Sequence, residues 1–235
     1  MKLNTDKCIG CGRCVIICPV QAIKIIDKKA VVDKDLCVEC STCIRSAGCP
    51  VNAIKHKRLK WPRLVRNPFS DVIATHRLTG IPGRGTEEMK TNDVTNRFGR
   101  DEVGFSIEVG RPGVGTRIGT IVLITTKLSE IGVEYEKASP ITALFIDDSG
   151  HIRDDVKNER VLSVIIEFKV HITKVEQILN LIKEIESQID TVFTVGMITR
   201  FNMDGSIPIL DLLTKNGFNP RPNAKINLGL GRATL

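Results

Sequence analysis

Residues 6–23 read DKCIGCGRCVIICPVQAI, and residues 35–54 repeat the pattern as DLCVECSTCIRSAGCPVNAI. Each half carries three cysteines at intervals of three residues, followed by a fourth cysteine that precedes a proline. All eight cysteines of the chain fall within these two stretches. A duplicated motif of this kind predicts a module with pseudo-twofold symmetry. Three closely spaced thiolates with a distant fourth are typical ligands of a [4Fe–4S] cluster.

The motif resembles that of bacterial two-cluster ferredoxins, and this resemblance implies that the ligands cross between the halves. The distant cysteine of each half then closes the cluster held by the other half. The first cluster would be bound by Cys8, Cys11, Cys14 and Cys49, and the second by Cys37, Cys40, Cys43 and Cys18. In the second half five residues, 44–48, separate the third and fourth cysteines instead of the usual three, and we expect a longer surface loop there.

Two other uses of cysteine are disfavoured. Zinc needs four ligands per ion, and it leaves the third cysteine, the Cys-Pro pair and the duplication unexplained. A disulfide framework is disfavoured because no cysteine lies outside the motifs and MKLNTDKC at residues 1–8 has no apolar stretch like a secretory signal. We therefore expect a reducing, cytoplasmic compartment. No apolar run approaches the ~18 residues of a membrane helix, so we expect no membrane span.

The chain is longer than a cluster module requires. Its 235 residues exceed a module of about 55 and leave room for one further domain. We expect the cluster module at 1–58, a basic connector and an ordered Gly/Thr-rich segment at 59–102, and an α+β domain at 103–235. The formal net charge of +7 falls to about +3 if two clusters each contribute about −2, which weakens the case for nucleic-acid binding.

Residues 55–66, KHKRLKWPRLVR, contain six lysines and arginines and no acidic residue. We favour an interdomain connector in which Trp61 and Leu64 dock the cluster module while the charges stay solvated. A patch for an acidic redox partner is the second interpretation. The third is an RNA-binding strip with Trp61 as a stacking platform.

The remaining sequence alternates strand and helix patterns. We expect strands at 103–110, 141–147, 161–170 and 191–201, and helices at 116–132 and from Thr173 onward. Glu176 completes a capping box with Thr173. This β-α-β-β-α-β order is the split βαβ, or ferredoxin-like, arrangement. A short helix at 207–217 and an extended tail at 218–235 follow, and we expect the tail to contact a partner.

Two segments of this domain are candidate binding sites. The first is GRPGVGTR at 110–117, whose glycines and following helix N-terminus suit an anion such as a carboxylate or phosphate. The residues proposed there are Arg111, Gly113, Gly115, Thr116 and Arg117, and a plain strand-to-helix turn remains open. In the second segment, 83–93, Thr86 caps a helical start and Glu87 and Asp93 serve as acid or base, unless these carboxylates belong to a solvated loop.

Three strings suggest a more specific relationship, namely GRGTEEMKTNDVTNRFG at 83–99, EVGRPGVGTR at 108–117 and INLGLGRA at 226–233. Together with the cysteine module they resemble the N-terminal half of 6-hydroxynicotinate reductase, a ferredoxin-dependent anaerobic reductase. That family is longer and carries a flavin, whereas this chain has no Ser/Thr-Gly-Ala-Thr flavin-attachment string. The resemblance therefore implies an electron-delivering half whose flavin lies on a partner subunit.

The sequence thus predicts an iron-sulfur electron-transfer protein that delivers electrons within an anaerobic cytoplasmic reductase complex, as part of an oligomer or hetero-complex. One alternative is a complete reductase of a small carboxylated heterocycle. Another is a redox-responsive regulator that binds a ligand or RNA.

Overall fold

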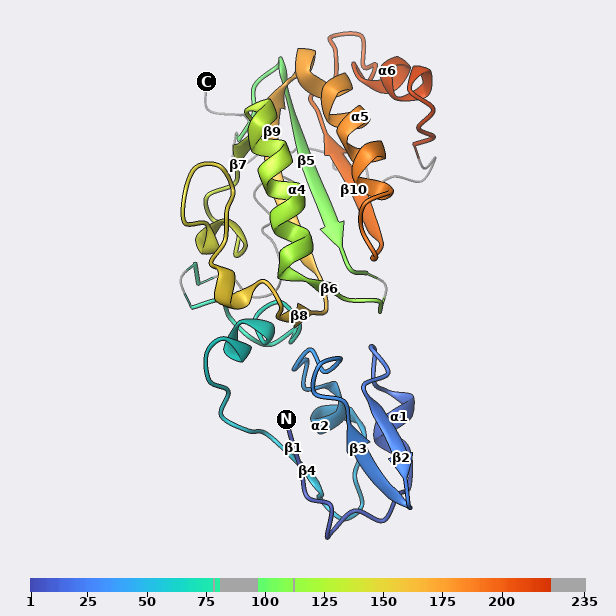
Figure 1. The fold of residues 1–235 in the computed structure, drawn as a ribbon. Helices are drawn as coiled ribbons and strands as arrows, with labels where there is room; N and C mark the ends of the chain where they lie inside the picture. Colours follow the sequence, from blue (N-terminus) through green and yellow to red (C-terminus); the bar gives the residue numbers. More distant parts are fainter. Residues whose placement is uncertain (78, 81–96, 112, 221–235) are drawn as a thin grey trace.

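The computed structural model describes residues 1–77, 79–80, 97–111 and 113–220. The candidate residues Thr86, Glu87 and Asp93, and residues 221–235 of the expected tail, lie outside this part of the chain. The fold is mixed α+β. In Figure 1 the cysteine module lies below a larger sheet domain, and the connector runs along one side between them. None of the described helices is long and apolar enough to cross a membrane.

The cysteine module is built from two small antiparallel ladders and two short helices. Its elements are β1 (Lys2–Leu3), α1 (Arg13–Ile16), β2 (Ile23–Ile26), β3 (Lys29–Val32), α2 (Thr42–Ser46) and β4 (Ile54–Lys55). β1 pairs with β4 and β2 with β3. Each helix follows a residue in the left-handed conformation, Gly12 in the first half and Ser41 in the second. The sequence repeat is therefore also a repeat of backbone conformation.

The longer segment of the second half, 44–48, lies partly on the surface as expected, since Arg45, Ser46 and Gly48 are exposed. Helix α2 has five residues where α1 has four, and a bend at Ala47 follows it. Ala47 is buried at 6% exposure, and the Arg13 guanidinium donates a hydrogen bond of 2.9 Å to the Gly48 carbonyl. Within this segment Ala47 is therefore packed inside the module, while Gly48 contacts the first half through Arg13.

The larger domain contains a four-stranded antiparallel sheet in the order β10-β5-β9-β7. Helices α4 and α5 cover one face of this sheet (Figure 1). The bounds are β5 (Glu102–Val109), α4 (Ile118–Ile131), β7 (Glu134–Tyr135), β9 (Val164–His171), α5 (Val175–Glu186), β10 (Phe193–Ile198) and α6 (Leu210–Lys215). A separate ladder pairs β6 (Thr116–Arg117) with β8 (Arg160–Val161). The 3-10 turns are η1 (Arg63–Arg66), η2 (Thr142–Leu144), η3 (Asp154–Val156) and η4 (Ile172–Lys174).

The core lies between the sheet and the two helices. Phe105 of β5 stands opposite Phe168 of β9, and their rings stack with centroids 5.0 Å apart. Helix α5 turns an apolar stripe toward the core, and all of its members are buried: Val175, Ile178, Leu179, Ile182 and Ile185. Gly132 ends α4 in the left-handed conformation, as its sequence position predicts.

The sequence prediction of a strand at 141–147 was wrong. This segment forms the turn η2 and contributes only a single bridge between Phe145 and Ile152. Its amides bond locally, for example Leu144 N–H to the Ile141 carbonyl, so they do not pair with the sheet. The short strand β7 takes the sheet edge instead.

The expected cap of α5 was also wrong. Thr173 lies inside the turn η4, which precedes the helix. The residue before that turn, His171, accepts a hydrogen bond from the Thr173 N–H through Nδ1 at 3.4 Å. The capping side chain therefore sits two residues earlier than the capping-box pattern indicates.

Tyr135, the only tyrosine of the chain, provides a test of this core. Its hydroxyl donates to the Thr125 carbonyl at 2.6 Å, and its ring packs edge-on against Phe145. Burial raises the pKa of Tyr135 to about 12, against about 10 for a free phenol. The stabilisation from the neutral phenol is therefore complete below pH about 10 and is lost as pH rises through about 12. Tyrosinate absorbance should show this late titration, with a return to about 10 in denaturant; an apparent pKa near 10 in the folded protein would contradict the packing.

Candidate metal centres

Two cavities in the cysteine module are each lined by four cysteines. The first contains Cys8, Cys11, Cys14 and Cys49 in its wall. The second contains Cys18, Cys37, Cys40 and Cys43. Each set combines three cysteines of one half with the Cys-Pro cysteine of the other, which is the crossed grouping expected from the sequence. Within the described residues, no three His, Cys, Asp or Glu side chains converge as the ligands of a single metal ion do.

The surroundings of the sulfur atoms suit thiolate ligands. The two Cys-Pro cysteines have equivalent donors, since Ala22 N–H points at Cys18 Sγ at 3.2 Å and Ala53 N–H at Cys49 Sγ at 3.3 Å. Ala30 N–H donates to Cys8 Sγ at 3.3 Å. Hydrogen bonds to sulfur stabilise its negative charge and tune the reduction potential of a bound cluster. All eight cysteines are free of disulfides.

The cavity walls disfavour an isolated thiolate. Burial raises the pKa of the Cys43 thiol to about 12, and it also raises that of Cys14. For Cys49, burial works in the same direction, but backbone hydrogen bonds led by that from Ala53 lower its pKa overall. The positively charged iron-sulfur core of a bound cluster offsets the free-energy cost of burying the negative charge of the thiolates. Four thiols, few competing polar groups and N–H donors aimed at sulfur therefore fit a [4Fe–4S] centre in each cavity.

The first cavity depends on a glycine. Gly10 has φ of +67°, and a Cβ there would lie 2.4 Å from the carbonyl oxygen of Lys28, in the turn between β2 and β3. Gly12 has a similar φ of +76° but open space around it. We expect Gly10→Ala to lower the free energy of unfolding by roughly 1–3 kcal/mol more than Gly12→Ala, because only the first adds overpacking to the left-handed strain. If denaturant titrations show equal losses of unfolding free energy for the two variants, the backbone at Lys28 moves aside at little cost and the prediction is contradicted.

The 110–117 loop lies against the second cavity. A Cβ on Gly113 would be 3.1 Å from the Pro19 carbonyl, and one on Gly115 would be 3.8 Å from Val20. Both Pro19 and Val20 line the second cavity, directly after Cys18 in its wall. The glycines of this loop therefore permit close contact between the two domains.

The structure does not bring Arg111 and Arg117 together on one anion. Arg111 is exposed and pairs with Glu108 of its own strand at 2.8 Å. Arg117 crosses to the cysteine module, where it pairs with Asp35 at 2.7 Å and lowers the pKa of that carboxyl by hydrogen bonding. Thr116 is buried in β6. The loop thus joins the two domains. Both guanidiniums are already paired with carboxylates of the chain itself.

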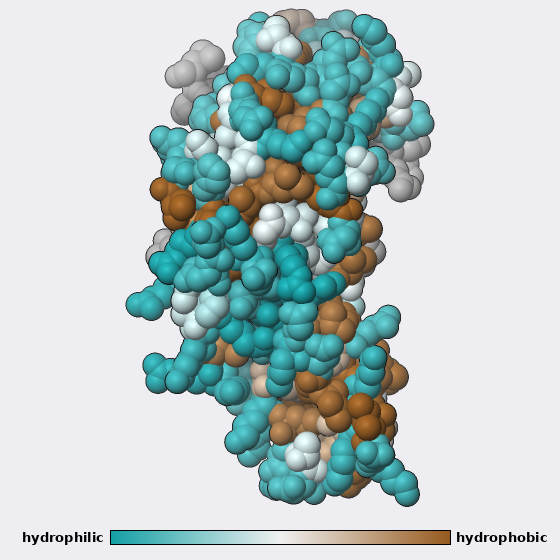
Figure 2. Space-filling model, viewed as in Figure 1, coloured by the Kyte–Doolittle hydropathy of each residue, from teal (hydrophilic) through white to brown (hydrophobic). Residues whose placement is uncertain are grey.

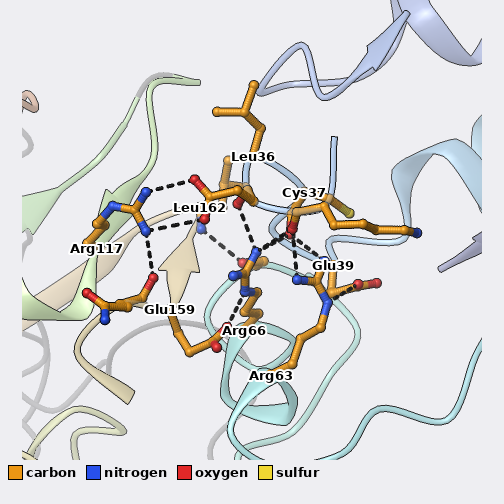
Figure 3. A network of polar contacts seen from close by, with 12 residues as sticks. Leu36, Cys37, Glu39, Arg63, Arg66, Arg117, Glu159 and Leu162 are labelled. Carbon is orange, nitrogen blue, oxygen red and sulfur yellow. Dashed lines mark hydrogen bonds and ion pairs between the residues drawn. The ribbon is translucent and has the colours of Figure 1, made fainter. Parts of the chain in front are cut away.

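Sequence reasoning missed the polar network that includes Cys37 and Glu39 of the second cavity (Figure 3). Arg66 is buried at 4% exposure and donates to the carbonyls of Lys34, Asp35 and Cys37 at 3.1, 2.9 and 2.7 Å. It also forms a short ion pair with Glu159 of the larger domain. The expected solvation of the connector charges is therefore wrong for Arg66. This side chain bridges residues 34–37, here called the ligand segment, and the α+β domain.

Arg63 lies one 3-10 turn before Arg66 and points at the same segment. It pairs with Glu39 at 2.7 Å and donates to the Lys34 and Cys37 carbonyls at 2.8 and 3.1 Å. Glu39 also pairs closely with the amino group of Met1. Although burial raises the pKa of Glu39, these two cationic partners lower it overall. The only sequence signal was the spacing of the two arginines, which places them on one side of a 3-10 turn.

Trp61 has a different role from the expected one. Its indole Nε1 donates to Asp155 of the larger domain at 2.6 Å, and the Arg153 guanidinium lies 5.2 Å from the ring centroid. Leu64 is 46% exposed. The prediction that Trp61 and Leu64 dock the cysteine module was therefore wrong, since arginine side chains make the contacts with that module.

Comparisons with known proteins agree with this geometry. A 4Fe-4S binding domain model matches residues 1–24. The chain is 43% identical over 58 residues to pyruvate synthase subunit PorD of Methanothermobacter marburgensis, which covers 25% of this chain and 65% of that subunit. It is 40% identical over 55 residues to ferredoxin 7Fe of Hydrogenibacillus schlegelii, covering 23% of this chain and 68% of the relative.

A third relative matches over a longer stretch. Ferredoxin Fdx2 of Sorangium cellulosum is 32% identical over 100 residues, which covers 40% of this chain and 93% of that protein. No solved structure matches the chain. The cysteine sets, their sulfur hydrogen bonds and these relatives lead to one conclusion. The chain belongs to the ferredoxin family through its N-terminal module, and it is an iron-sulfur electron-transfer protein that binds [4Fe–4S] centres.

Proposed function

We propose that the chain binds two [4Fe–4S] clusters, one in each cavity, and delivers electrons as a subunit of a larger reductase. The observation that carries this proposal is the crossed grouping of four cysteines around each cavity. When bound, such clusters supply one-electron storage and transfer. The chain itself supplies the thiolates, the N–H donors to sulfur and the contacts that hold the module on its second domain.

The surroundings of the two cavities suggest separate roles. Near the first cavity Cys11 is exposed, as are Ile9 at 59% and Ile16 at 85%. The second cavity adjoins the α+β domain through Pro19, Val20 and the Arg66 network. We infer that electrons enter from a carrier at the first centre and leave by the second, beside the interdomain contact.

The partner assignment rests on the second domain and on the relatives. PorD is by name a subunit of pyruvate synthase, and its match covers 25% of this chain, which leaves the greater part of the chain without a counterpart in that match. The order β-α-β-β-α-β in that domain, with its sheet order β10-β5-β9-β7, supports a split βαβ fold. We propose that this domain attaches the electron-transfer module to a flavin-bearing subunit of a cytoplasmic, anaerobic reductase of the 6-hydroxynicotinate reductase type.

Purification under anaerobic conditions from the native source tests this function. We expect about eight iron and eight sulfide per chain, since each [4Fe–4S] centre holds four of each. Flavin should co-purify on a separate polypeptide. A monomer that itself contains flavin and reduces a heterocyclic acid would support the complete-reductase alternative and contradict the subunit role.

A further inference from the structure

We propose that a basic groove beside the second cavity docks the acidic surface of a redox partner protein. This inference rests on the proposed two-cluster electron delivery and adds the place and charge of the partner contact. The groove has an open volume of about 1030 Å³. It is lined by Met1, Lys34, Glu39, Lys57, Arg58, Leu59, Lys60, Trp61 and Arg63.

The charge of the groove is strongly one-sided. Five lysine and arginine side chains face one carboxylate, Glu39, which already pairs with Arg63 and with the amino group of Met1. Lys57, Arg58 and Lys60 are exposed, and no ion pair joins them to any part of the chain that the structure describes. A concentrated positive field of this kind attracts an acidic surface and orients it during encounter.

The groove also lies next to the second centre. Met1 and Glu39 line both the groove and the second cavity. Arg63, on the groove wall, donates to the carbonyl of the ligand Cys37 at 3.1 Å. A partner seated in the groove is therefore separated from the second centre by the ligand segment and a few hydrogen-bonded groups.

The residue types of the lining suit a protein surface. Five of the nine residues that line the groove are lysine or arginine, so the groove offers several cationic groups to one partner. Figure 2 shows a hydrophilic surface where the connector runs between the two domains, while hydrophobic residues gather near the lower end of the molecule, where β2 and β3 lie in Figure 1. The groove thus has the character of the polar part of a protein interface.

The environment of Trp61 favours an acidic protein over a nucleic acid. Single strands bind through successive bases stacked on open aromatic faces. Trp61 is the only tryptophan, its indole N–H is bonded to Asp155, and the Arg153 guanidinium lies over its ring at 5.2 Å. One face of the Trp61 ring is covered, and the groove lining contains no second aromatic residue. Successive bases therefore lack a row of open aromatic faces on which to stack.

Peptide binding to the anaerobic holoprotein tests the surface. An oligoglutamate peptide should bind in calorimetry and change Trp61 emission, while oligolysine of the same length should not bind. Lys57→Glu with Lys60→Glu should weaken oligoglutamate binding about tenfold. The matched control, Lys137→Glu with Lys215→Glu on the exposed surface of the other domain, should weaken it less than about twofold because these charges are distant and screened. Equal weakening in both pairs, absence of oligoglutamate binding, or tighter binding of an oligouridylate of equal charge would overturn the proposal.

Electron exchange provides the second measurement. Ferricyanide, an anionic oxidant, should oxidise the reduced holoprotein about tenfold more slowly in the Lys57→Glu, Lys60→Glu variant, and cationic hexaamminecobalt(III) should react faster. The visible absorbance of the clusters should match that of the unmodified protein. Unchanged rates with both oxidants would overturn the groove as an electron exit. Iron analysis that shows only one cluster would instead contradict the proposed function, while the peptide measurement would still decide whether the groove binds acidic chains.

Discussion

Replacing Arg66 with alanine should lower the free energy of unfolding by about 3–5 kcal/mol, the range for breaking a buried ion pair from one side. The guanidinium is almost fully buried and serves Glu159 and three carbonyls of the ligand segment together. Its removal leaves the Glu159 carboxylate, which is 14% exposed, without its partner. Anaerobic denaturant titrations followed by circular dichroism and by cluster absorbance should show this loss, with the clusters released first.

Two further variants separate packing from charge. Arg63→Ala should cost less than Arg66→Ala, because Arg63 is 26% exposed and Glu39 keeps the amino group of Met1 as a partner. Arg66→Met combined with Glu159→Gln should recover part of the loss, because it removes both charges at once. An Arg66→Ala variant as stable as the unmodified protein would show that the network does not hold the two domains together.

The second large effect is expected at Cys49. Replacing it with alanine should remove the cluster of the first cavity and leave the cluster of the second. The reason is that Cys49 lines the cavity of Cys8, Cys11 and Cys14, although it follows the other three cysteines of its own half in sequence. Iron content should fall by about half, since each centre holds four irons. Cys18→Ala is the matched control, and it should remove the second cluster instead.

The sequence predicts those parts of the structure that depend on local patterns. Cysteine spacing predicts which three cysteines of one half line each cavity, because these three lie within seven residues of one another. The apolar stripe of α5 and the glycine that ends α4 are local in the same sense. The edge strand is less predictable, because the alternation at 141–147 resembles a strand while its amides find partners within the turn η2.

The contacts between the domains could not be predicted in this way. Arg66 and Glu159 are 93 residues apart in sequence, and Arg117 and Asp35 are 82 apart. No periodic pattern indicates which carboxylate a given arginine meets at such a separation. The glycines at 113 and 115 were interpreted as an anion loop because close backbone approach to a ligand and close approach to another domain require the same residue type.

Paired cysteine substitutions test the central claim of two centres with crossed ligands most directly. Cys8→Ala with Cys49→Ala removes two ligands from the first cavity, whereas Cys37→Ala with Cys49→Ala removes one from each cavity. We predict that the first double variant, purified anaerobically, keeps about half of the iron and one [4Fe–4S] spectrum, and that the second loses both clusters. Retention of one cluster in the second variant together with loss of both in the first would show that each half binds its own cluster and would contradict the crossed arrangement.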